Sequence, residues 1–195
     1  TAKGIANRNI ELLKDIISEK TPIVGIEPSA ILSFRDEYPD LAEKENTENA
    51  KKLASNTFLF DEFIAAEIDK GNITAEKFTE ESKKIKFHGH CQQKSIITTK
   101  FTKKILSLPK NYFVEEIPSG CCGMAGSFGY EKEHYDLSMK IGEMVLFPAI
   151  RNANPETIIC AVGTSCRCQI EDGTGVKALH PIEILYDAII PKDKS

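Results

Sequence analysis

The chain has 195 residues, of which 41% are hydrophobic and 28% are charged, and this is the composition of an ordinary globular protein rather than of a disordered one. Its formal net charge of −4 is small and no basic stretch dominates, which argues against nucleic acid as a partner. No apolar run approaches the roughly 20 residues that a membrane-spanning helix needs.

The first part of the chain is predicted to combine amphipathic helices with one short strand. The apolar run at residues 23–26 is continuous, as in a buried parallel strand, and Pro22 separates it from the helix before it. Gly71 and Asn72 end the last helix of this part in the manner of a C-cap. The predicted helical segments lie at residues 4–17, 30–35, 43–52 and 58–68.

The second part of the chain begins near residue 84 and alternates strands with helices more regularly. Such alternation is typical of βαβ units and predicts a parallel sheet. The predicted strands lie at residues 85–88, 112–117, 157–162 and 176–179, and the predicted helices at residues 96–106, 131–150 and 181–189.

Six cysteines all lie after residue 90, and their spacing is not that of a secreted disulfide framework. Cys121–Cys122 and Cys166–Cys168 are too closely spaced for such a framework, and the opening at Thr1 does not resemble a signal peptide. Clustered cysteines without an export signal indicate metal or redox sites, so we expect a cytoplasmic protein. The missing start methionine also leads us to expect a piece of a longer protein.

The double cysteine lies in a loop with glycine at positions 120, 123, 126 and 129. Two thiolates on one tight turn can reach a common metal, and glycine lets backbone N–H groups point at sulfur. Cys91 and Cys166 also follow predicted strands, and the carboxyl ends of parallel strands share one edge of a sheet. We therefore expect four thiols at one edge. A flexible glycine loop with incidental cysteines is the alternative interpretation.

At these residues the sequence resembles the cysteine-rich CCG domain, which occurs in a subunit of heterodisulfide reductase and in the iron–sulfur subunits of glycolate oxidase and anaerobic glycerol-3-phosphate dehydrogenase. It is most similar to the C-terminal part of FAD-linked oxidases that act on D-2-hydroxy acids, such as D-lactate and D-2-hydroxyglutarate. The motifs that carry the resemblance are HGHCQQK at 88–94, CCGMAGSFGY at 121–130, GTSCR at 163–167 and His180-Pro181.

The resemblance implies two copies of the domain. Residues 84–195 resemble a complete repeat, and residues 1–83 resemble the end of a truncated first repeat that lacks its cysteines. Where the family commonly has a cysteine after Pro28-Ser29, this chain has Ala30. The expected fold is α/β, with mainly parallel sheets, flanking helices and two similar halves.

The resemblance also implies a ligand set. It comprises Cys91, Cys121, Cys122 and Cys166, and four thiolates is the usual number for an iron–sulfur cluster or a structural zinc. The family's last cysteine pair would begin at Gly163, where this chain departs from the pattern. Cys168 is either an extra ligand or an unused thiol. The cofactor is therefore expected to be a 4Fe–4S cluster or zinc, and the site could be empty, oxidised or zinc-substituted in this fragment.

Four further residues are predicted to contact the cofactor. Gly123 and Gly126 would present backbone N–H groups, Arg167 would offset the negative charge of the thiolates, and His90 would donate a hydrogen bond. His88 is interpreted as a similar donor or as a packed histidine. Cys160 is expected to be a small buried hydrophobic residue within a strand. His180 is expected to begin the last helix, with its ring hydrogen-bonded to backbone near the site.

Three functions remain open from the sequence. The first, implied by the resemblance, is electron transfer from a flavin to a downstream acceptor, with FAD in another part of the same parent chain that oxidises a D-2-hydroxy acid. The second is a structural zinc domain that organises a partner interface, and the third is a thiol–disulfide redox domain. In the first case, the fragment alone is expected to be inactive.

Overall fold

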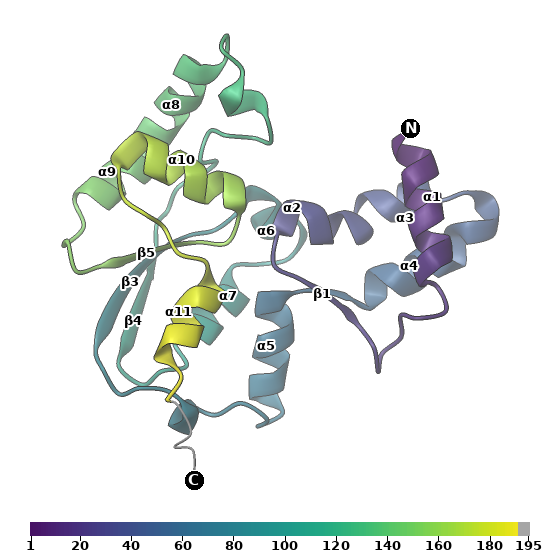
Figure 1. Cartoon of the computed structure of the whole chain (residues 1–195), viewed down its shortest axis with the longest axis horizontal. Helices are drawn as coiled ribbons and strands as arrows, with labels where there is room; N and C mark the ends of the chain where they lie inside the picture. Colours follow the sequence, from purple (N-terminus) through teal and green to yellow (C-terminus); the bar gives the residue numbers. More distant parts are fainter. Residues whose placement is uncertain (191–195) are drawn as a thin grey trace. The chain divides into compact units, whose positions relative to one another are not determined.

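The structure is a computed structural model that describes residues 1–190 of the chain. It divides into two compact units, Thr1–Phe63 and Ile64–Ser195. Each unit contains a small sheet of parallel strands flanked by helices, so the predicted α/β class with mainly parallel sheets is confirmed (Figure 1). The assignment of residues 1–83 and 84–195 to two repeats stays a prediction.

The first unit is built mostly from short helices. Its sheet pairs only two strands, with Ile23 opposite Thr57 and Gly25 opposite Leu59. Its core gathers Ile10, Ala50 and Leu53 between two helices. The elements in order are α1 (Ala2–Leu13), β1 (Ile23–Gly25), α2 (Pro28–Ile31), α3 (Glu37–Leu41), α4 (Thr47–Ser55), β2 (Thr57–Leu59) and the start of α5 (Phe60–Asp69), with 3₁₀ turns at Leu32–Phe34 and Lys44–Asn46.

The second unit holds all six cysteines and a three-stranded parallel sheet in the order β4-β3-β5. Leu179 adds a single parallel bridge to Cys160, where the sequence predicted a fourth strand. The elements in order are β3 (Lys83–His88), α6 (Cys91–Ile96), α7 (Lys100–Leu106), β4 (Tyr112–Glu116), α8 (Tyr135–Met144), α9 (Leu146–Arg151), β5 (Ile158–Ala161), α10 (Thr164–Thr174) and α11 (Pro181–Ala188), with 3₁₀ turns at Ala75–Lys77 and Phe128–Tyr130.

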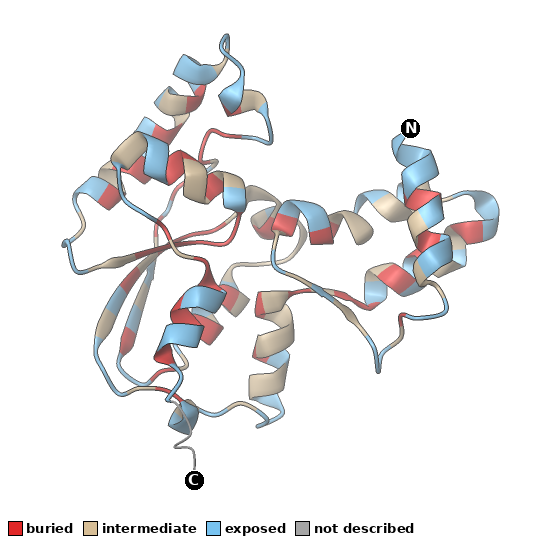
Figure 2. Cartoon of the chain, in the orientation of Figure 1, coloured by how far each residue is buried: buried red, intermediate tan, exposed pale blue. Residues whose placement is uncertain are grey.

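The core of the second unit lies where the C-terminal part of β5 meets α9 and α10. Phe147, Ile159 and Ile170 are buried there, and Figure 2 shows buried residues on the sides of these helices that face the strands. Cys122 and Cys166 belong to the same buried cluster. The cysteines of interest are therefore fixed by apolar packing, because the residues around them are the core of the unit.

Four sequence predictions of helices and loops were wrong in detail. The predicted helix 96–106 begins only at Lys100, as α7, and residues 91–96 form a separate helix, α6, that the sequence did not predict. Residues 57–59, the last two of which open the predicted helix 58–68, form β2, because pairing with β1 outweighs local helix preference. The predicted helix 131–150 is two helices that break at Val145, where continuation would bring the ring of Pro148 against the preceding turn. The predicted loop after β5 is instead α10, which begins at Thr164 and carries Cys166.

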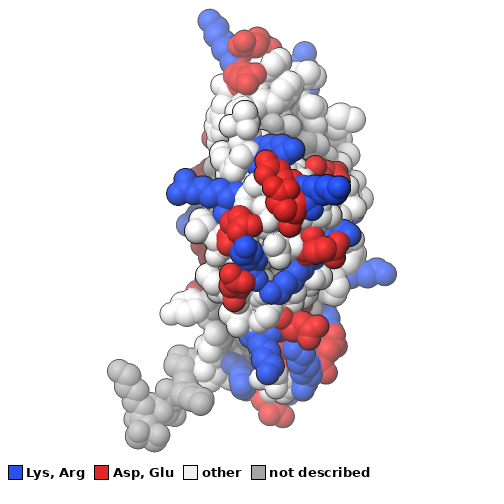
Figure 3. Space-filling model, turned by 90° about the vertical axis from the view of Figure 1, so that its right-hand side faces the viewer, with Lys and Arg blue, Asp and Glu red and all other residues white. Residues whose placement is uncertain are grey.

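Surface charges are mixed in sign. Figure 3 shows lysine and arginine side chains next to aspartate and glutamate side chains on one face of the molecule. Several are paired within one helix turn, such as Lys14 with Glu11 and Lys51 with Glu48. Among residues 1–190, no helix combines the length and the apolar character needed to cross a membrane.

Candidate metal centre

The cysteines lie in the segments that follow the carboxyl ends of three neighbouring parallel strands. Cys91 is the first residue of α6, shortly after β3 ends at His88. Cys121 and Cys122 follow β4, and Cys166 lies in the first turn of α10, directly after β5. Since β3 lies between β4 and β5, the three loops leave the same edge of the sheet.

The four thiols form one continuous chain of contacts. Cys91 is hydrogen-bonded to Cys121, Cys121 to Cys122, and Cys122 to Cys166. Cys122 and Cys166 are buried, whereas Cys91 and Cys121 are half-buried. The four side chains therefore lie in a row of pairwise contacts, while their role as ligands of one site stays a prediction.

The contacts between the thiols shift their pKa values in different directions. The pKa of Cys121 is lowered, because it accepts hydrogen bonds from Cys122 and Cys91 and from a backbone N–H. The pKa of Cys166 falls to about 5, chiefly through its hydrogen bond with Cys122 and then through His88. The pKa values of Cys91 and Cys122 are raised by the same hydrogen bonds, which they donate, and by burial. The lowered pKa values favour the thiolate, the form that binds metals, at Cys121 and Cys166.

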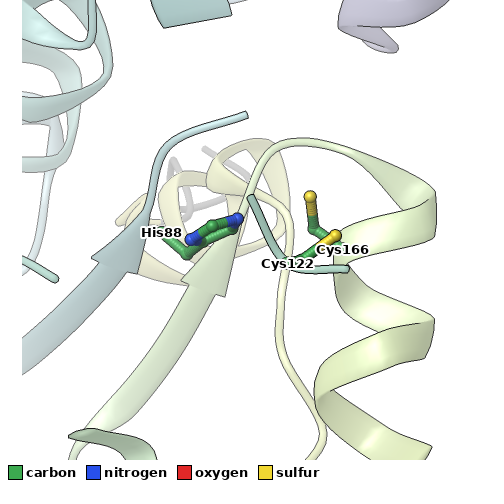
Figure 4. Close-up of side chains that lie close together, drawn as sticks. All are labelled: His88, Cys122 and Cys166. Atoms are coloured by element: carbon green, nitrogen blue, oxygen red, sulfur yellow. The ribbon is translucent and has the colours of Figure 1, made fainter. Parts of the chain in front are cut away.

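His88 lies in contact with the buried end of this chain. Its side chain is 0% exposed, and its Nδ1 atom lies 2.7 Å from Ser119 Oγ. One ligand atom from each of His88, Cys122 and Cys166 lies within 4.8 Å of the other two (Figure 4). The sequence interpretation treated His88 as a donor or a packed residue and did not place it among the ligands. Its position at the end of a strand two residues before His90-Cys91 was the available signal.

Two glycines of the double-cysteine loop, Gly123 and Gly126, have positive φ. Gly123 has φ of +104° and its N–H donates to Cys121 Sγ at 3.3 Å. A Cβ atom at this position would lie 2.2 Å from the carbonyl oxygen of Ser138, so only glycine fits without a shift. Gly126 also has positive φ, of +70°, but an added Cβ would meet nothing within 4 Å.

A lysine that the sequence interpretation missed fixes the start of the same loop. Lys94 Nζ donates to the carbonyl oxygens of Ser119 and Gly120, at 2.8 and 3.0 Å. It thereby joins α6 to the backbone just before Cys121. The spacing of Lys94, one turn after Cys91 in a helix, could have indicated that it reaches the same loop.

His90 connects two of the cysteine-bearing segments. Its Nδ1 atom accepts from the N–H of Gln92 at 3.2 Å and so caps the helix that begins at Cys91. Its ring also lies against Gly163, where an added Cβ would be 2.4 Å from His90 Cδ2. The ring is therefore held between the starts of α6 and α10, and it helps to lower the pKa of Cys166, after Cys122 and His88.

Arg167 and Cys168 lie beside the thiol chain with partners of their own. Arg167 donates to the carbonyl oxygens of Ala161 and Val162, at 3.1 and 2.7 Å, and so binds the end of β5. Cys168 is hydrogen-bonded to Tyr130, which raises the pKa of the tyrosine. These contacts give both residues a structural role, whatever they contribute to a bound cofactor.

Cys160 and His180 have the predicted local roles, as a buried strand residue and as the start of a helix. Cys160 is fully buried within β5, as expected for a small hydrophobic residue. His180 begins α11 through a capping box, in which its ring accepts from the N–H of Ile182 and Glu183 accepts from its backbone N–H.

Comparison with known proteins gives relatives along almost the whole chain. This chain is 27% identical to a subunit of the anaerobic glycerol-3-phosphate dehydrogenase of Escherichia coli K12 over 189 residues. The matched residues cover 96% of this chain and 46% of the relative. It is 28% identical to D-2-hydroxyglutarate dehydrogenase of the same organism over 94% of this chain and 17% of the relative. The D-2-hydroxyglutarate dehydrogenase of Haemophilus influenzae is 26% identical over 94% of this chain.

The relatives are dehydrogenases or a dehydrogenase subunit. This chain spans less than half the length of each of these relatives. No protein-family model matches it, and no solved structure gives a significant match.

The donor set itself fits a metal or a metal–sulfur cluster. Sulfur is a soft ligand that favours zinc, copper(I) and iron–sulfur clusters over magnesium or calcium. Four thiols and a buried imidazole meet at one edge of the sheet, and two of the four already have a lowered pKa. The chemistry of the residues present therefore fits a soft metal ion or a metal–sulfur cluster.

Proposed function

We propose that this chain is an electron-transfer module of a flavin-linked oxidoreductase, and that Cys91, Cys121, Cys122 and Cys166 hold a 4Fe–4S cluster. The observation that carries the proposal is the continuous contact between these four thiols, which come from three separate strand ends. Four cysteine thiolates are the usual ligands of a 4Fe–4S cluster, which supplies one-electron transfer when bound.

The residues around the thiols suit this role. The N–H of Gly123 donates to Cys121 Sγ, and hydrogen bonds to sulfur are one of the means by which proteins set a cluster's reduction potential. Lys94 places a positive charge on the loop carbonyls beside Cys121. Cys122 and Cys166 are buried, which limits the access of water to them, whereas Cys91 and Cys121 are half-buried and lie nearer the surface.

The relatives support the role in an oxidoreductase. Their names describe oxidation of glycerol 3-phosphate or of D-2-hydroxyglutarate, and they are more than twice as long as this chain. We propose D-2-hydroxy acids as the substrate class, an FAD-containing domain of the same parent chain as the electron donor, and a separate downstream acceptor.

The test is anaerobic reconstitution of the chain with iron and sulfide, followed by analysis of bound iron and acid-labile sulfide. Serine at Cys91, Cys121, Cys122 or Cys166 is expected to abolish cluster assembly, because each removes one of four thiolates. Cys160→Ser is the matched control, since it changes a buried thiol of the same unit that lies outside the contact chain. Retention of the cluster in all four variants, or its loss in the control alone, contradicts the proposed ligand set.

A structural zinc site is the second candidate. The buried group of His88, Cys122 and Cys166 favours it, because zinc binds tetrahedral sets of cysteine and histidine. Stoichiometric zinc in the purified chain, without acid-labile sulfide after reconstitution, would support zinc and exclude the cluster.

A further inference from the structure

His88 differs from the other histidines at the strand ends in the way that its ring is used. His90 and His180 both accept a backbone N–H at Nδ1 and cap a helix. His88 instead directs Nδ1 to the hydroxyl of Ser119, and its Nε2 atom is buried without a hydrogen-bond partner among the described residues. A buried polar nitrogen of this kind needs an explanation, because nearly all such atoms in folded proteins are paired.

The surroundings of Ser119 allow its hydroxyl to accept the Nδ1 proton of His88. The Ser119 hydroxyl lies 3.4 Å from the carbonyl oxygen of Ile117, to which it donates, and its oxygen has a lone pair available to accept from the imidazole at 2.7 Å. In the tautomer in which the ring donates its Nδ1 proton to Ser119, His88 presents a lone pair at Nε2. This is the arrangement of a metal-binding histidine, whose other ring nitrogen usually donates to a neighbouring group that fixes the ring.

The unpaired nitrogen lies on the side of the two buried cysteines. The three ligand atoms of His88, Cys122 and Cys166 are within 4.8 Å of one another, and Figure 4 shows one ring nitrogen directed towards the cysteines. Bonds of about 2.0–2.1 Å to nitrogen and about 2.3 Å to sulfur would place tetrahedral ligand atoms roughly 3.5–3.8 Å apart. Small side-chain adjustments therefore suffice to close the group around one ion.

We propose that Nε2 of His88 is a metal ligand of this site, and that with Cys122 and Cys166 it forms the buried part of a donor set of which Cys91 and Cys121 are the outer part. The inference rests on the second candidate of the proposed function, a single ion held at this site, and it assigns the ring atom of His88 that would bind the ion. Ser119 is then a positioning residue, which acts on the metal through the His88 ring.

Cobalt(II) alone is the probe, added under anaerobic conditions to the metal-free chain and followed by titration and by X-ray absorption at the cobalt edge. The wild-type chain is expected to show sulfur neighbours together with the outer-shell scattering of one imidazole. His88→Gln is expected to lose the imidazole scattering and to bind cobalt at least about tenfold more weakly. His88→Cys should restore the affinity with an added sulfur neighbour and without imidazole.

Two further variants distinguish the loss of a metal ligand from a folding defect. His134→Gln changes an exposed histidine that is paired with Glu131 and should leave both readouts unchanged. Ser119→Ala keeps the ring but removes the acceptor for its Nδ1 proton, so the imidazole scattering should persist while the cobalt affinity falls about 10-fold to 100-fold.

Imidazole scattering that persists in His88→Gln, cobalt bound through sulfur alone in the wild type, or no cobalt binding would each overturn the proposal. None of these outcomes decides the proposed function, because that depends on iron and acid-labile sulfide measured separately. Conversely, an imidazole signal from cobalt in a chain that assembles no cluster would support the His88 ligand and reject the electron-transfer proposal.

Discussion

Gly123 is the residue at which the backbone geometry of the site is most restrictive. It combines φ of +104° with a neighbouring carbonyl oxygen only 2.2 Å from where a Cβ would lie. Gly126 shares the positive φ, of +70°, but has open space around it. Gly126 thus requires glycine only for its backbone conformation, whereas Gly123 requires it both for its conformation and because a side chain has no space there.

Alanine at these two positions should therefore differ in cost. Gly126→Ala is expected to lower the free energy of unfolding by about 1–2 kcal/mol, the cost of a left-handed conformation. Gly123→Ala should cost a further 1–3 kcal/mol or so, because the new methyl group meets the Ser138 backbone. Urea unfolding of the metal-free chain measures both values, and equal costs would show that the loop does not pack on α8 as described.

Cys121 and Cys91 have similar exposure but opposite shifts in pKa, which makes them a matched pair. The pKa of Cys121 is lowered by hydrogen bonds from Cys122 and Cys91, so its thiolate persists as the pH falls below the usual thiol range. The pKa of Cys91 is raised by its hydrogen bond to Cys121 and by burial, so its thiolate appears only at higher pH.

The alkylation of the metal-free chain should follow these shifts. With iodoacetamide near pH 7, Cys121 is expected to react before Cys91, and the rate at Cys121 should change little between about pH 6 and pH 8, because it is already a thiolate. The rate at Cys91 should rise with pH. Peptide mass spectrometry resolves the two sites, and faster labelling of Cys91 at pH 7 would show that the assigned direction of proton sharing is reversed.

At the scale of elements, α6 and the double-cysteine loop are joined by Lys94. Its two hydrogen bonds hold the carbonyl groups of Ser119 and Gly120 immediately before the thiols. Lys94→Met keeps the length of the side chain but removes both bonds, at an expected cost of about 1–2 kcal/mol in unfolding free energy. Amide hydrogen exchange in residues 117–124 should become faster.

Lys100→Met is the control for this change, since Lys100 is an exposed lysine at the start of the next helix, α7. It should leave exchange in residues 117–124 as in the wild type. If exchange in that segment is equally slow in the two variants, Lys94 does not hold the loop in solution.

The strands of the second unit could be predicted from the sequence more reliably than its helices. Strands β3, β4 and β5 could be placed because each is a short run rich in β-branched or aromatic residues, and each ends at polar or glycine-containing segments. Helix α10 was missed because its first turn, Thr164 to Arg167, has no apolar periodicity, and its sequence resembles a loop. Its start is instead defined by Gly163 packed against His90, a tertiary contact.

At the scale of the whole molecule, the convergence of four thiols followed from topology. Parallel strands place their carboxyl ends at one edge, and this rule sufficed to bring Cys91, Cys121, Cys122 and Cys166 together from the sequence alone. The role of His88 could not be derived in that way. It depends on the direction of one ring and on the hydroxyl of Ser119, which lies 31 residues away in sequence.

We propose that one edge of one sheet forms a single metal–sulfur site. X-ray absorption at the iron edge of the anaerobically reconstituted chain tests it most directly. We predict mainly sulfur neighbours together with iron–iron scattering, at about four irons per chain. Isolated iron with oxygen neighbours, or no iron retained after gel filtration while the fold is intact, would contradict the account.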